Sequence, residues 1–289
     1  MRIALLGFGL IGGSIARALR REAGVWTIAA WSPSGDGPQR ARSEGIIDEA
    51  AGSPAAAVRG ADLVILAGAP LACLELIDEL GGPLAEALGP DAVVTDVAST
   101  KEAMVRRADE AGLRFVGGHP MAGREVTGYG AAEPDLFEGR PWVMVPGAHA
   151  RRGDLERVEA LARACGAVPT EMTAGDHDAA VAAISHLPLV VAAALVETIA
   201  GAPGWPLEQR LAAGGWASMT RLARGDVEMG TGILATNGPA VAERLHTMRR
   251  ILDEWLAELE ADPPDPDRLR GRLASARGRL AADEPGEAR

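Results

Sequence analysis

The chain is short of positive charge. Its 289 residues include 40 acidic side chains against 29 lysines and arginines, which gives a formal net charge of −11. Nucleic acids and anionic membrane surfaces are bound by basic protein faces. The charge balance therefore argues against nucleic acid and membrane as partners, and an anionic ligand would need arginines placed close to it.

Cysteine is also scarce. Only Cys73 and Cys165 are present, far apart in the sequence. Two cysteines do not make a disulfide framework, and no set of histidines, cysteines and carboxylates has the spacing of a metal site. We predict two reduced core cysteines and no bound metal.

Long apolar runs are missing as well. The stretch that comes closest to the roughly 18 residues of a membrane span is 179–200. Ser185, His186, Pro188 and Glu197 interrupt it, which favours a core helix over a membrane helix. The first residues form a strand-like run without the layout of a signal peptide. We therefore expect a cytoplasmic protein.

Lysine occurs once, at Lys101, whereas arginine fills the other 28 basic positions. An ammonium group is compact and strongly hydrated, unlike the planar guanidinium group of arginine. A single lysine among so many arginines indicates a position that needs this smaller cation.

The first part of the chain alternates short apolar runs with helical patterns, which is typical of a parallel α/β sheet. The expected strands are 3–6, 26–31, 46–49, 63–67, 93–96, 115–116 and 142–145, and the expected helices are 10–21, 39–44, 101–111 and 151–165. Beyond residue 173 the strand pattern ends. The expected helices there are 176–200, broken near Pro188, and 207–224, 239–260 and 267–281.

This pattern predicts an α/β protein of two domains. Residues 1–172 would form a Rossmann-like, doubly wound dinucleotide-binding domain, and residues 173–289 an all-α domain. Because the second domain is apolar over long stretches, we expect it to complete its core by forming a homodimer.

A glycine-rich turn joins the first expected strand to the first expected helix and reads Gly7-Phe8-Gly9-Leu10-Ile11-Gly12. In this position Gly7 permits a tight turn, Gly9 lets the backbone approach a pyrophosphate, and Gly12 packs the helix on the strand. The helix N-terminus then offers amides to the phosphates. We predict cofactor contacts along this turn and from Ala98 and Lys101 further on.

The end of the second expected strand bears on the choice between NAD and NADP. An acidic residue there would bind the ribose 2′-hydroxyl and repel a 2′-phosphate. The chain instead has Ser32 and Ser34, with Asp36 slightly later and two arginines, Arg40 and Arg42, beyond it. The serines favour NADP, although Asp36 keeps NAD as an alternative.

Two further motifs place a histidine and a serine beside the expected nicotinamide. One reads Asp96-Val97-Ala98-Ser99-Thr100-Lys101, and the other reads Gly117-Gly118-His119-Pro120-Met121-Ala122-Gly123. A neutral imidazole can accept the proton released when an alcohol is oxidised, and a serine hydroxyl can orient that alcohol. The motifs indicate a dehydrogenase with His119 as general base and Ser99 as its catalytic partner.

In this order, the glycine-rich turn, these two motifs and the later Ser185-His186-Leu187-Pro188 resemble the prephenate/arogenate dehydrogenase family of tyrosine biosynthesis. The resemblance covers residues 1 to about 256. It implies hydride transfer from C4 of a small anionic cyclohexadienyl substrate to NAD(P), with loss of carbon dioxide. Prephenate would give 4-hydroxyphenylpyruvate, and L-arogenate would give tyrosine.

The resemblance also implies the residues that bind the substrate. Arg221 would bind a carboxylate through its planar fork, and His186 would face the substrate. The remaining positions are Ser185, Gly214, Arg124 and Glu125. Arg124 favours the keto acid prephenate and Glu125 favours the amine of arogenate, so the two conflict. We expect prephenate, with arogenate and 4-amino-4-deoxyprephenate as alternatives.

The chain departs from the family pattern at several positions. Leu189 replaces a common histidine, the segment 216–219 lacks a common acid, Gly230 replaces a common tryptophan, and Arg124 replaces a small hydroxyl residue. These changes leave the reaction class intact and concern the identity of the substrate.

Three other functions fit the sequence less well than a prephenate/arogenate dehydrogenase. An NADP-linked imine or pyrroline-carboxylate reductase would not need Ser99, His119 and His186 together. A lysine-dependent hydroxyacid dehydrogenase would need its lysine on the long interdomain helix, whereas the only lysine is Lys101. A non-catalytic NADP-binding protein would not need His119 and Arg221. The remaining histidines, His149, His177 and His246, have no partner pattern and are interpreted as structural or surface residues.

Overall fold

The computed structural model describes residues 1–21, 24–124 and 126–283. The chain divides into two compact units, Met1–Val241 and Ala242–Arg289. The first unit holds the whole sheet together with the helices from α1 to α11, so several helices of the expected second domain belong to the same compact unit as the sheet. The division expected at residue 172 therefore stays a prediction about domain organisation.

The first unit is built on one eight-stranded sheet in the order β3-β2-β1-β4-β5-β6-β7-β8. All neighbouring strands are parallel except β6 and β7, which run antiparallel. The α/β class and the doubly wound arrangement expected from the sequence are confirmed. The strands are β1 Arg2–Leu6, β2 Thr27–Trp31, β3 Glu49–Ala50, β4 Leu63–Leu66, β5 Val93–Asp96, β6 Phe115–Pro120, β7 Pro141–Pro146 and β8 Val168–Glu171.

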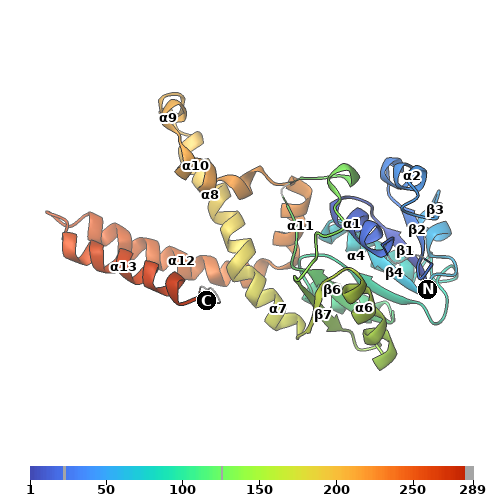
Figure 1. Ribbon diagram of the computed structural model, residues 1–289. Helices are drawn as coiled ribbons and strands as arrows, with labels where there is room; N and C mark the ends of the chain where they lie inside the picture. Colours follow the sequence, from blue (N-terminus) through green and yellow to red (C-terminus); the bar gives the residue numbers. More distant parts are fainter. Residues whose placement is uncertain (22–23, 125, 284–289) are drawn as a thin grey trace, which may run out of the picture. The chain divides into compact units, whose positions relative to one another are not determined.

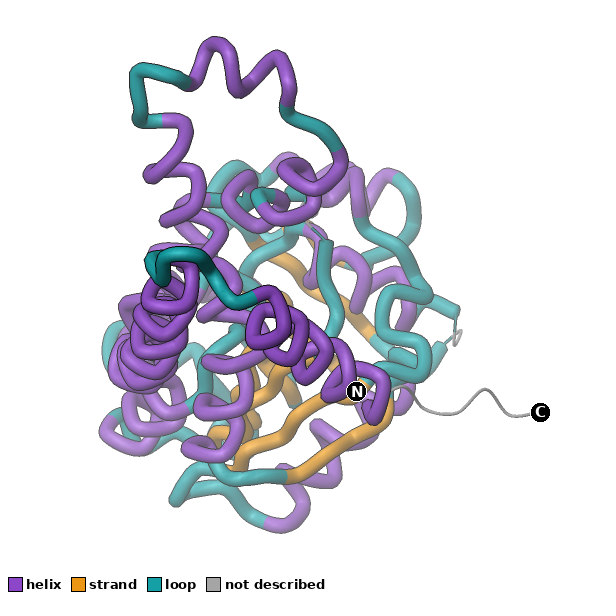
Figure 2. Tube along the Cα trace, turned by 90° about the vertical axis from the view of Figure 1, so that its left-hand side faces the viewer, coloured by secondary structure: helices purple, strands orange, loops and turns teal. Residues whose placement is uncertain are grey.

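Helices connect the strands and cover both faces of the sheet (Figure 1, Figure 2). They are α1 Leu10–Leu19, α2 Asp36–Ser43, α3 Pro54–Val58, α4 Pro70–Gly81, α5 Glu102–Glu110 and α6 Arg152–Ala164, with a short 3₁₀ turn η1 at Tyr129–Ala131. Side chains alternate between the two faces along each strand. In β1, for example, Ile3 and Leu5 pack into one core cluster, and Ala4 and Leu6 into the other.

The two cysteines lie in different core clusters. Cys165 belongs to the cluster that contains α1 and α6, and Cys73 to the one that contains α3, α4 and α5. Both are buried, and the sheet separates the two clusters. Their surroundings agree with the expectation of core cysteines.

The helical part follows β8. It contains α7 Ala174–Val181, a π-helical turn η2 at Ala182–His186, α8 Leu187–Ala200, α9 Trp205–Leu211, α10 Gly214–Met219, a 3₁₀ turn η3 at Arg221–Arg224, α11 Val227–Thr236, α12 Gly238–Leu259 and α13 Pro266–Asp283. The π turn stands directly before Pro188, where the sequence predicts a break. Helix α8 leads away from the sheet and ends near α9 and α10 (Figure 1).

Several expected elements differ from the observed ones. The helix expected at 207–224 is three short pieces, interrupted at 212–213 and at Thr220. Strand β6 runs to Pro120 rather than ending at Val116, so His119 lies within the sheet. Helices α3, α4 and α11 and strand β8 were not expected from the sequence.

The second unit consists of the later part of α12 together with α13. Arg272 lies over the ring of Trp255, 4.5 Å from its centre, and its guanidinium lies 3.3 Å from Glu254. A second ion pair joins Arg268 and Glu258 at 3.7 Å. These contacts hold the two helices together as an antiparallel pair.

Among the described residues, one helical stretch is long and apolar enough to cross a membrane by length and composition alone. It spans Ala174–Ala200, and its most apolar 18-residue window has a mean hydropathy of 2.2 and is only 22% buried. Core helices of soluble proteins also pass this test. Polar residues of its first half belong to the site described next.

Candidate active site

The glycine-rich turn after β1 has room for a ligand's phosphates. Gly7 has φ +99°, and a Cβ there would lie 2.5 Å from the carbonyl oxygen of Ala67. A Cβ on Gly12 would lie 2.7 Å from the carbonyl oxygen of Gly7, whereas one on Gly9 would meet nothing within 4 Å. The turn is therefore closed on its inner side and open at Gly9. This geometry fits a pyrophosphate on the N-terminus of α1.

The other residues of the turn contribute backbone rather than side chains to that opening. Phe8 and Leu10 are buried, and the Phe8 ring stacks on Tyr129 with 5.2 Å between ring centres. The partly buried Ile11 packs against the core cluster that contains Phe8. The first amides of α1 lack partners within the helix, as at every helix start, and are the groups that would face a cofactor.

The end of β2 carries the two serines expected to select the cofactor. Gly35 has φ +73°, and Ser34 accepts a hydrogen bond of 3.4 Å from the amide of Asp36, in the first turn of α2. The two arginines beyond are engaged elsewhere. Arg40 pairs with Glu44 at 2.8 Å, and Arg42 donates to the backbone carbonyl of Asp48.

A buried ion pair joins the single lysine, Lys101, to Asp96 at the carboxyl end of β5, and both side chains are fully buried. Asp96 also accepts hydrogen bonds from the amides of Ala98 at 2.9 Å and Gly118 at 3.0 Å. The pair therefore fixes the backbone on both sides of Ser99, which is itself partly exposed. It also ties β5 to the strand that carries His119.

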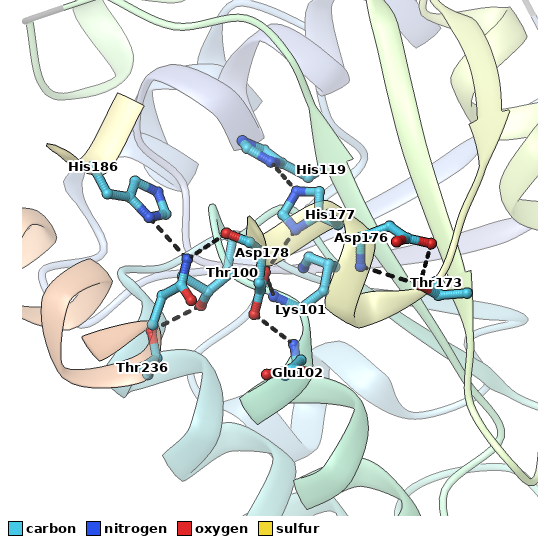
Figure 3. A network of polar contacts seen from close by, with 12 residues as sticks. Thr100, Lys101, Glu102, His119, Thr173, Asp176, His177, Asp178, His186 and Thr236 are labelled. Carbon is cyan, nitrogen blue, oxygen red and sulfur yellow. Dashed lines mark hydrogen bonds and ion pairs between the residues drawn. The ribbon is translucent and has the colours of Figure 1, made fainter. Parts of the chain in front are cut away.

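His119 faces a second histidine. It lies on β6, opposite Val143 of β7, and its Nδ1 is 2.8 Å from Nε2 of His177 on α7. The Nδ1 of His177 is in turn 2.7 Å from Oδ1 of Asp178. Figure 3 shows the three side chains in a row, with His177 between the other two. His177 and Asp178 are each only 1% exposed.

Asp178 also caps the start of α5. Its Oδ1 accepts a hydrogen bond of 2.7 Å from the amide of Lys101, and its Oδ2 accepts one of 2.9 Å from the amide of Glu102 (Figure 3). A carboxylate is stabilised at a helix N-terminus by the amides and by the helix dipole. Helix α7 is thereby attached to the segment that follows Ser99.

His186 lies in the π turn η2, and its side chain is buried. The Nδ2 of Asn237 donates to the backbone carbonyl of Asp178 at 2.9 Å and lies 3.1 Å from Nδ1 of His186. An amide nitrogen only donates, so the Nδ1 of His186 is the acceptor and its hydrogen is on Nε2. That Nε2 is buried and has no hydrogen-bond partner among the described residues.

Both histidines are held in their neutral form. Burial lowers the pKa of His119 well below its ordinary value, and the neighbouring His177, Lys101 and His186 lower it further. Burial lowers the pKa of His186 to about 4, against an opposing effect of Asp178. A neutral His119 can accept a proton, and a neutral His186 with its hydrogen on Nε2 can donate a hydrogen bond.

Four further residues were predicted to bind the substrate, and all four are exposed. Ser185 is exposed next to His186, Gly214 is exposed at the start of α10, and Arg221 is exposed on η3, which packs against α8. Arg124 is exposed and forms a two-bond ion pair with Glu133. Glu125 lies outside the described residues.

Three residues of the network were not expected from the sequence to belong to the site. His177 was interpreted as structural or surface, and Asp178 and Asn237 were not assigned a role. Two signals could have pointed to Asn237: it is the only asparagine of the chain, and it is among the residues that resemble the family. Among the described residues, no group of three or more histidines, cysteines and carboxylates could hold a metal ion.

A Rossmann-like sheet, an open glycine turn and a partly buried histidine of lowered pKa define a nicotinamide-dependent dehydrogenase. Comparison with family models agrees with this class and narrows it. The nucleotide-binding domain of prephenate dehydrogenase matches residues 15–171, and the dimerization domain of prephenate dehydrogenase matches residues 173–274. The chain belongs to the prephenate dehydrogenase family.

Individual relatives support this assignment. The chain is 34% identical to prephenate dehydrogenase of Bacillus subtilis over 262 residues, which is 89% of this chain and 68% of that protein. Synechocystis arogenate dehydrogenase is 31% identical, with a TM-score of 0.77 over 97% of this chain and all of that one. A. aeolicus prephenate dehydrogenase, in complex with hydroxyphenyl propionate and NAD⁺, is 28% identical, with a TM-score of 0.86 over 98% of both chains.

Proposed function

We propose that this chain catalyses the oxidative decarboxylation of prephenate to 4-hydroxyphenylpyruvate, with His119 as general base. The observation that carries the proposal is His119, a partly buried histidine of lowered pKa on the strand next to the Ser99 turn, with its Nδ1 2.8 Å from His177 of α7. The relatives named prephenate dehydrogenase support the substrate. L-arogenate, the substrate named for the Synechocystis relative, is the second candidate.

The chain's own residues would perform the proton chemistry and hold the substrate. His119 accepts the C4 hydroxyl proton as hydride leaves C4, and Ser99 orients that hydroxyl. A bound nicotinamide ring supplies the acceptor for the hydride. The ring carboxylate departs as carbon dioxide, its bonding electrons make the ring aromatic, and the ring oxygen takes a proton back. His186 donates from Nε2 to an oxygen of the substrate.

Arginines would supply the positive charge that an anionic substrate needs in a chain of net charge −11. Arg221 binds one carboxylate of the substrate as a planar fork, with the backbone of Gly214 and Ser185 lining the same end. Arg124 is the second candidate, and the two-bond pair with Glu133 would have to open before it binds a carboxylate. Glu125 stays an expected substrate contact.

NADP is the proposed cofactor, with NAD as the alternative. The turn from Gly7 to Gly12 would hold the pyrophosphate on the N-terminus of α1, and Ala98 and Lys101 would border the nicotinamide end. Ser32 and Ser34 offer hydroxyls to a 2′-phosphate and present no acidic group at the end of β2. Both nearby arginines have partners of their own, so the serines carry this proposal.

A homodimer formed through the helical part is the proposed assembly. Among the fourteen residues of α8 only Ala192 is buried, although the helix is strongly apolar. Further exposed apolar side chains follow on α9 and α10, namely Leu207, Leu211 and Met219. A second copy would cover this surface. The polar contacts of His177, Asp178 and His186 with β6, α5 and Asn237 hold the first half of 174–200, which supports a helix of a cytoplasmic protein over a membrane helix.

The test is the absorbance of reduced nicotinamide with purified protein, using prephenate and L-arogenate, each with NAD⁺ and NADP⁺. We expect the fastest rise with prephenate and NADP⁺. A faster rise with arogenate would overturn the substrate, and one with NAD⁺ the cofactor. If the absorbance rises in none of the four mixtures while a titration shows that the cofactor binds, the proposed reaction is wrong. The next substrate to test is then 4-amino-4-deoxyprephenate.

A further inference from the structure

The hydrogen-bond roles in the row His119, His177 and Asp178 can be assigned from one end. Both oxygens of Asp178 accept backbone amides, at 2.7 Å from Lys101 and 2.9 Å from Glu102. An amide N–H only donates, so neither oxygen carries a proton facing these partners. Asp178 is therefore a carboxylate at the N-terminus of α5, where negative charge is favoured.

The hydrogen-bond role of His177 follows from that of Asp178. The Nδ1 of His177 is 2.7 Å from the same carboxylate, so it carries the ring hydrogen and donates it. We take His177 as a neutral imidazole, which has one ring hydrogen, so that its Nε2 carries a lone pair. The Nδ1 of His119, 2.8 Å away, must then be a donor. The free Nε2 of His119 is left with a lone pair.

His186 has the opposite arrangement. Its Nδ1 accepts from Asn237, whose orientation is fixed because the same nitrogen also donates to the carbonyl of Asp178. The hydrogen of His186 is therefore on Nε2, which is buried without a partner among the described residues. The network thus leaves one histidine with an open acceptor and the other with an open donor.

We propose that His177 and Asp178 are positioning residues that hold His119 as its Nδ1–H tautomer, while Asn237 holds His186 as the opposite tautomer. This inference rests on the proposed function for its meaning in catalysis. It assigns each histidine one role toward the substrate. His119 accepts the hydroxyl proton at Nε2, and His186 donates a hydrogen bond to a substrate oxygen from its own Nε2.

The proton balance of the step is simple. The substrate O–H bond breaks and an N–H bond forms at Nε2 of His119, while the hydrogen on Nδ1 stays in its bond to His177. The new positive charge is stabilised through His177 by the Asp178 carboxylate, as an aspartate stabilises the imidazolium of a catalytic triad. Lys101 and His186 also face His119, and Asp96 neutralises Lys101.

The first experiment measures the tautomers directly, without substrate. Protein labelled with ¹⁵N in its histidine rings is loaded with NADP⁺ or NAD⁺, and long-range ¹H–¹⁵N spectra are recorded at pH 7.5. The resonances are assigned with His119→Asn and His186→Asn. We expect the hydrogen on Nδ1 of His119 and on Nε2 of His186. A hydrogen on Nε2 of His119, or a doubly protonated His177, would overturn the inference.

The second experiment uses two replacements of His177. A leucine cannot accept from Nδ1 of His119, whereas the amide oxygen of a glutamine can. We expect His177→Leu to lower kcat by about 10²-fold, within the usual worth of a general base, and His177→Gln to retain about a tenth of the activity or more. The KM for the cofactor should stay within about threefold in both, and His149→Gln, at an exposed position, should match the parent protein.

Equal kcat losses in the leucine and glutamine variants, or none in either, would overturn the positioning role, and a thermal melt of each shows whether it is folded. The two experiments also separate the inference from the proposed function. The inferred tautomers without turnover of prephenate or arogenate would refute the function and leave the inference standing. Turnover of prephenate or arogenate by a protein with a different tautomer of His119 or His186 would support the function and refute the inference.

Discussion

The pKa and the orientation of the His119 ring depend on the groups around it. Burial and three nearby groups lower its pKa, so it stays neutral as the pH falls through the ordinary histidine range. The acid limb of kcat/KM should therefore lie below about pH 6.5, the ordinary histidine pKa. The same neighbours that keep the ring neutral also hold its orientation.

Replacing His119 with asparagine tests the general base. We expect turnover to fall by two to four decades, the usual contribution of proton transfer, because the amide cannot accept the hydroxyl proton. Cofactor affinity should not change, since the glycine turn carries cofactor binding. Steady-state kinetics and a fluorescence titration with cofactor measure the two quantities. An unchanged kcat would remove His119 from the mechanism.

His186 links stability to pH. Its pKa is about 4 in the folded chain and about 6.5 when unfolded, so the unfolded state binds the proton first as pH falls. The stabilisation is complete above pH 6.5 and is lost toward pH 4. From the two pKa values we expect the free energy of unfolding to drop by about 2 kcal/mol between pH 7 and pH 5.

Urea unfolding at the two pH values measures this drop, and His186→Gln should reduce it. His246→Gln, at an exposed position, is the matched control and should lose as much stability as the parent protein. If the parent protein and His186→Gln lose equal stability between pH 7 and pH 5, His186 does not titrate as described.

At the residue scale, the sequence predicted the site residues that stand in short motifs. Ser99 and His119 were predicted because each stands in a short motif with recognisable chemistry. His177 was not found, because its partner His119 is 58 residues away in the chain, and Asp178 reaches amides 76 and 77 residues away. A contact that only the packing of α7 creates leaves no pattern in the neighbouring residues.

At the scale of elements, strand β6 has the largest effect on the site. The sequence predicted two residues, and the observed strand has six, because its second half pairs antiparallel with β7. Glycines at 117 and 118 hide this pairing, since they weaken a strand pattern. The long helix and strands β1, β2 and β4 were predicted because their apolar patterns are strong, and the glycine turn because of its spacing. The strand expected at 46–49 shares only Glu49 with β3.

The end of β2 offers a test of cofactor choice. Ser32→Asp places a carboxylate where a 2′-phosphate would lie and where a ribose hydroxyl could bind it. We expect the ratio of kcat/KM for NAD⁺ to that for NADP⁺ to rise at least about tenfold, which corresponds to 1.4 kcal/mol. Thr27→Asp, at the exposed opposite end of the same strand, should leave the ratio unchanged. An unchanged ratio in Ser32→Asp would refute the role of this turn.

At the scale of the whole molecule, the exposed apolar surface of the helical part is the feature that needs a partner. Leu207 and Leu211 are 63% and 75% exposed, four residues apart on α9. Single exposed leucines are ordinary, whereas a continuous apolar surface on neighbouring helices marks an interface. The sequence predicted this part as helical and apolar, but the breaks between α9, α10 and η3 were not predicted.

Replacing both leucines with aspartate should disrupt the proposed dimer, because a twofold interface would then bury four unpaired charges. We expect the parent protein to sediment with twice the mass of the 29.9 kDa chain and the Leu207→Asp, Leu211→Asp variant as a monomer. Val168→Asp, at a 53% exposed position on β8, is the control and should remain a dimer. A monomeric parent protein would refute the assembly.

The hydrogen bonds of Asp178 have a consequence for how activity is lost. The same carboxylate holds the start of α5 and the ring next to His119, so the proposed general base has this hydrogen-bond partner only when α7 is docked. The glycine turn does not depend on that contact. Mild denaturant should therefore stop turnover before it releases cofactor, and catalytic rate becomes a sensitive reporter of the docking of a single helix.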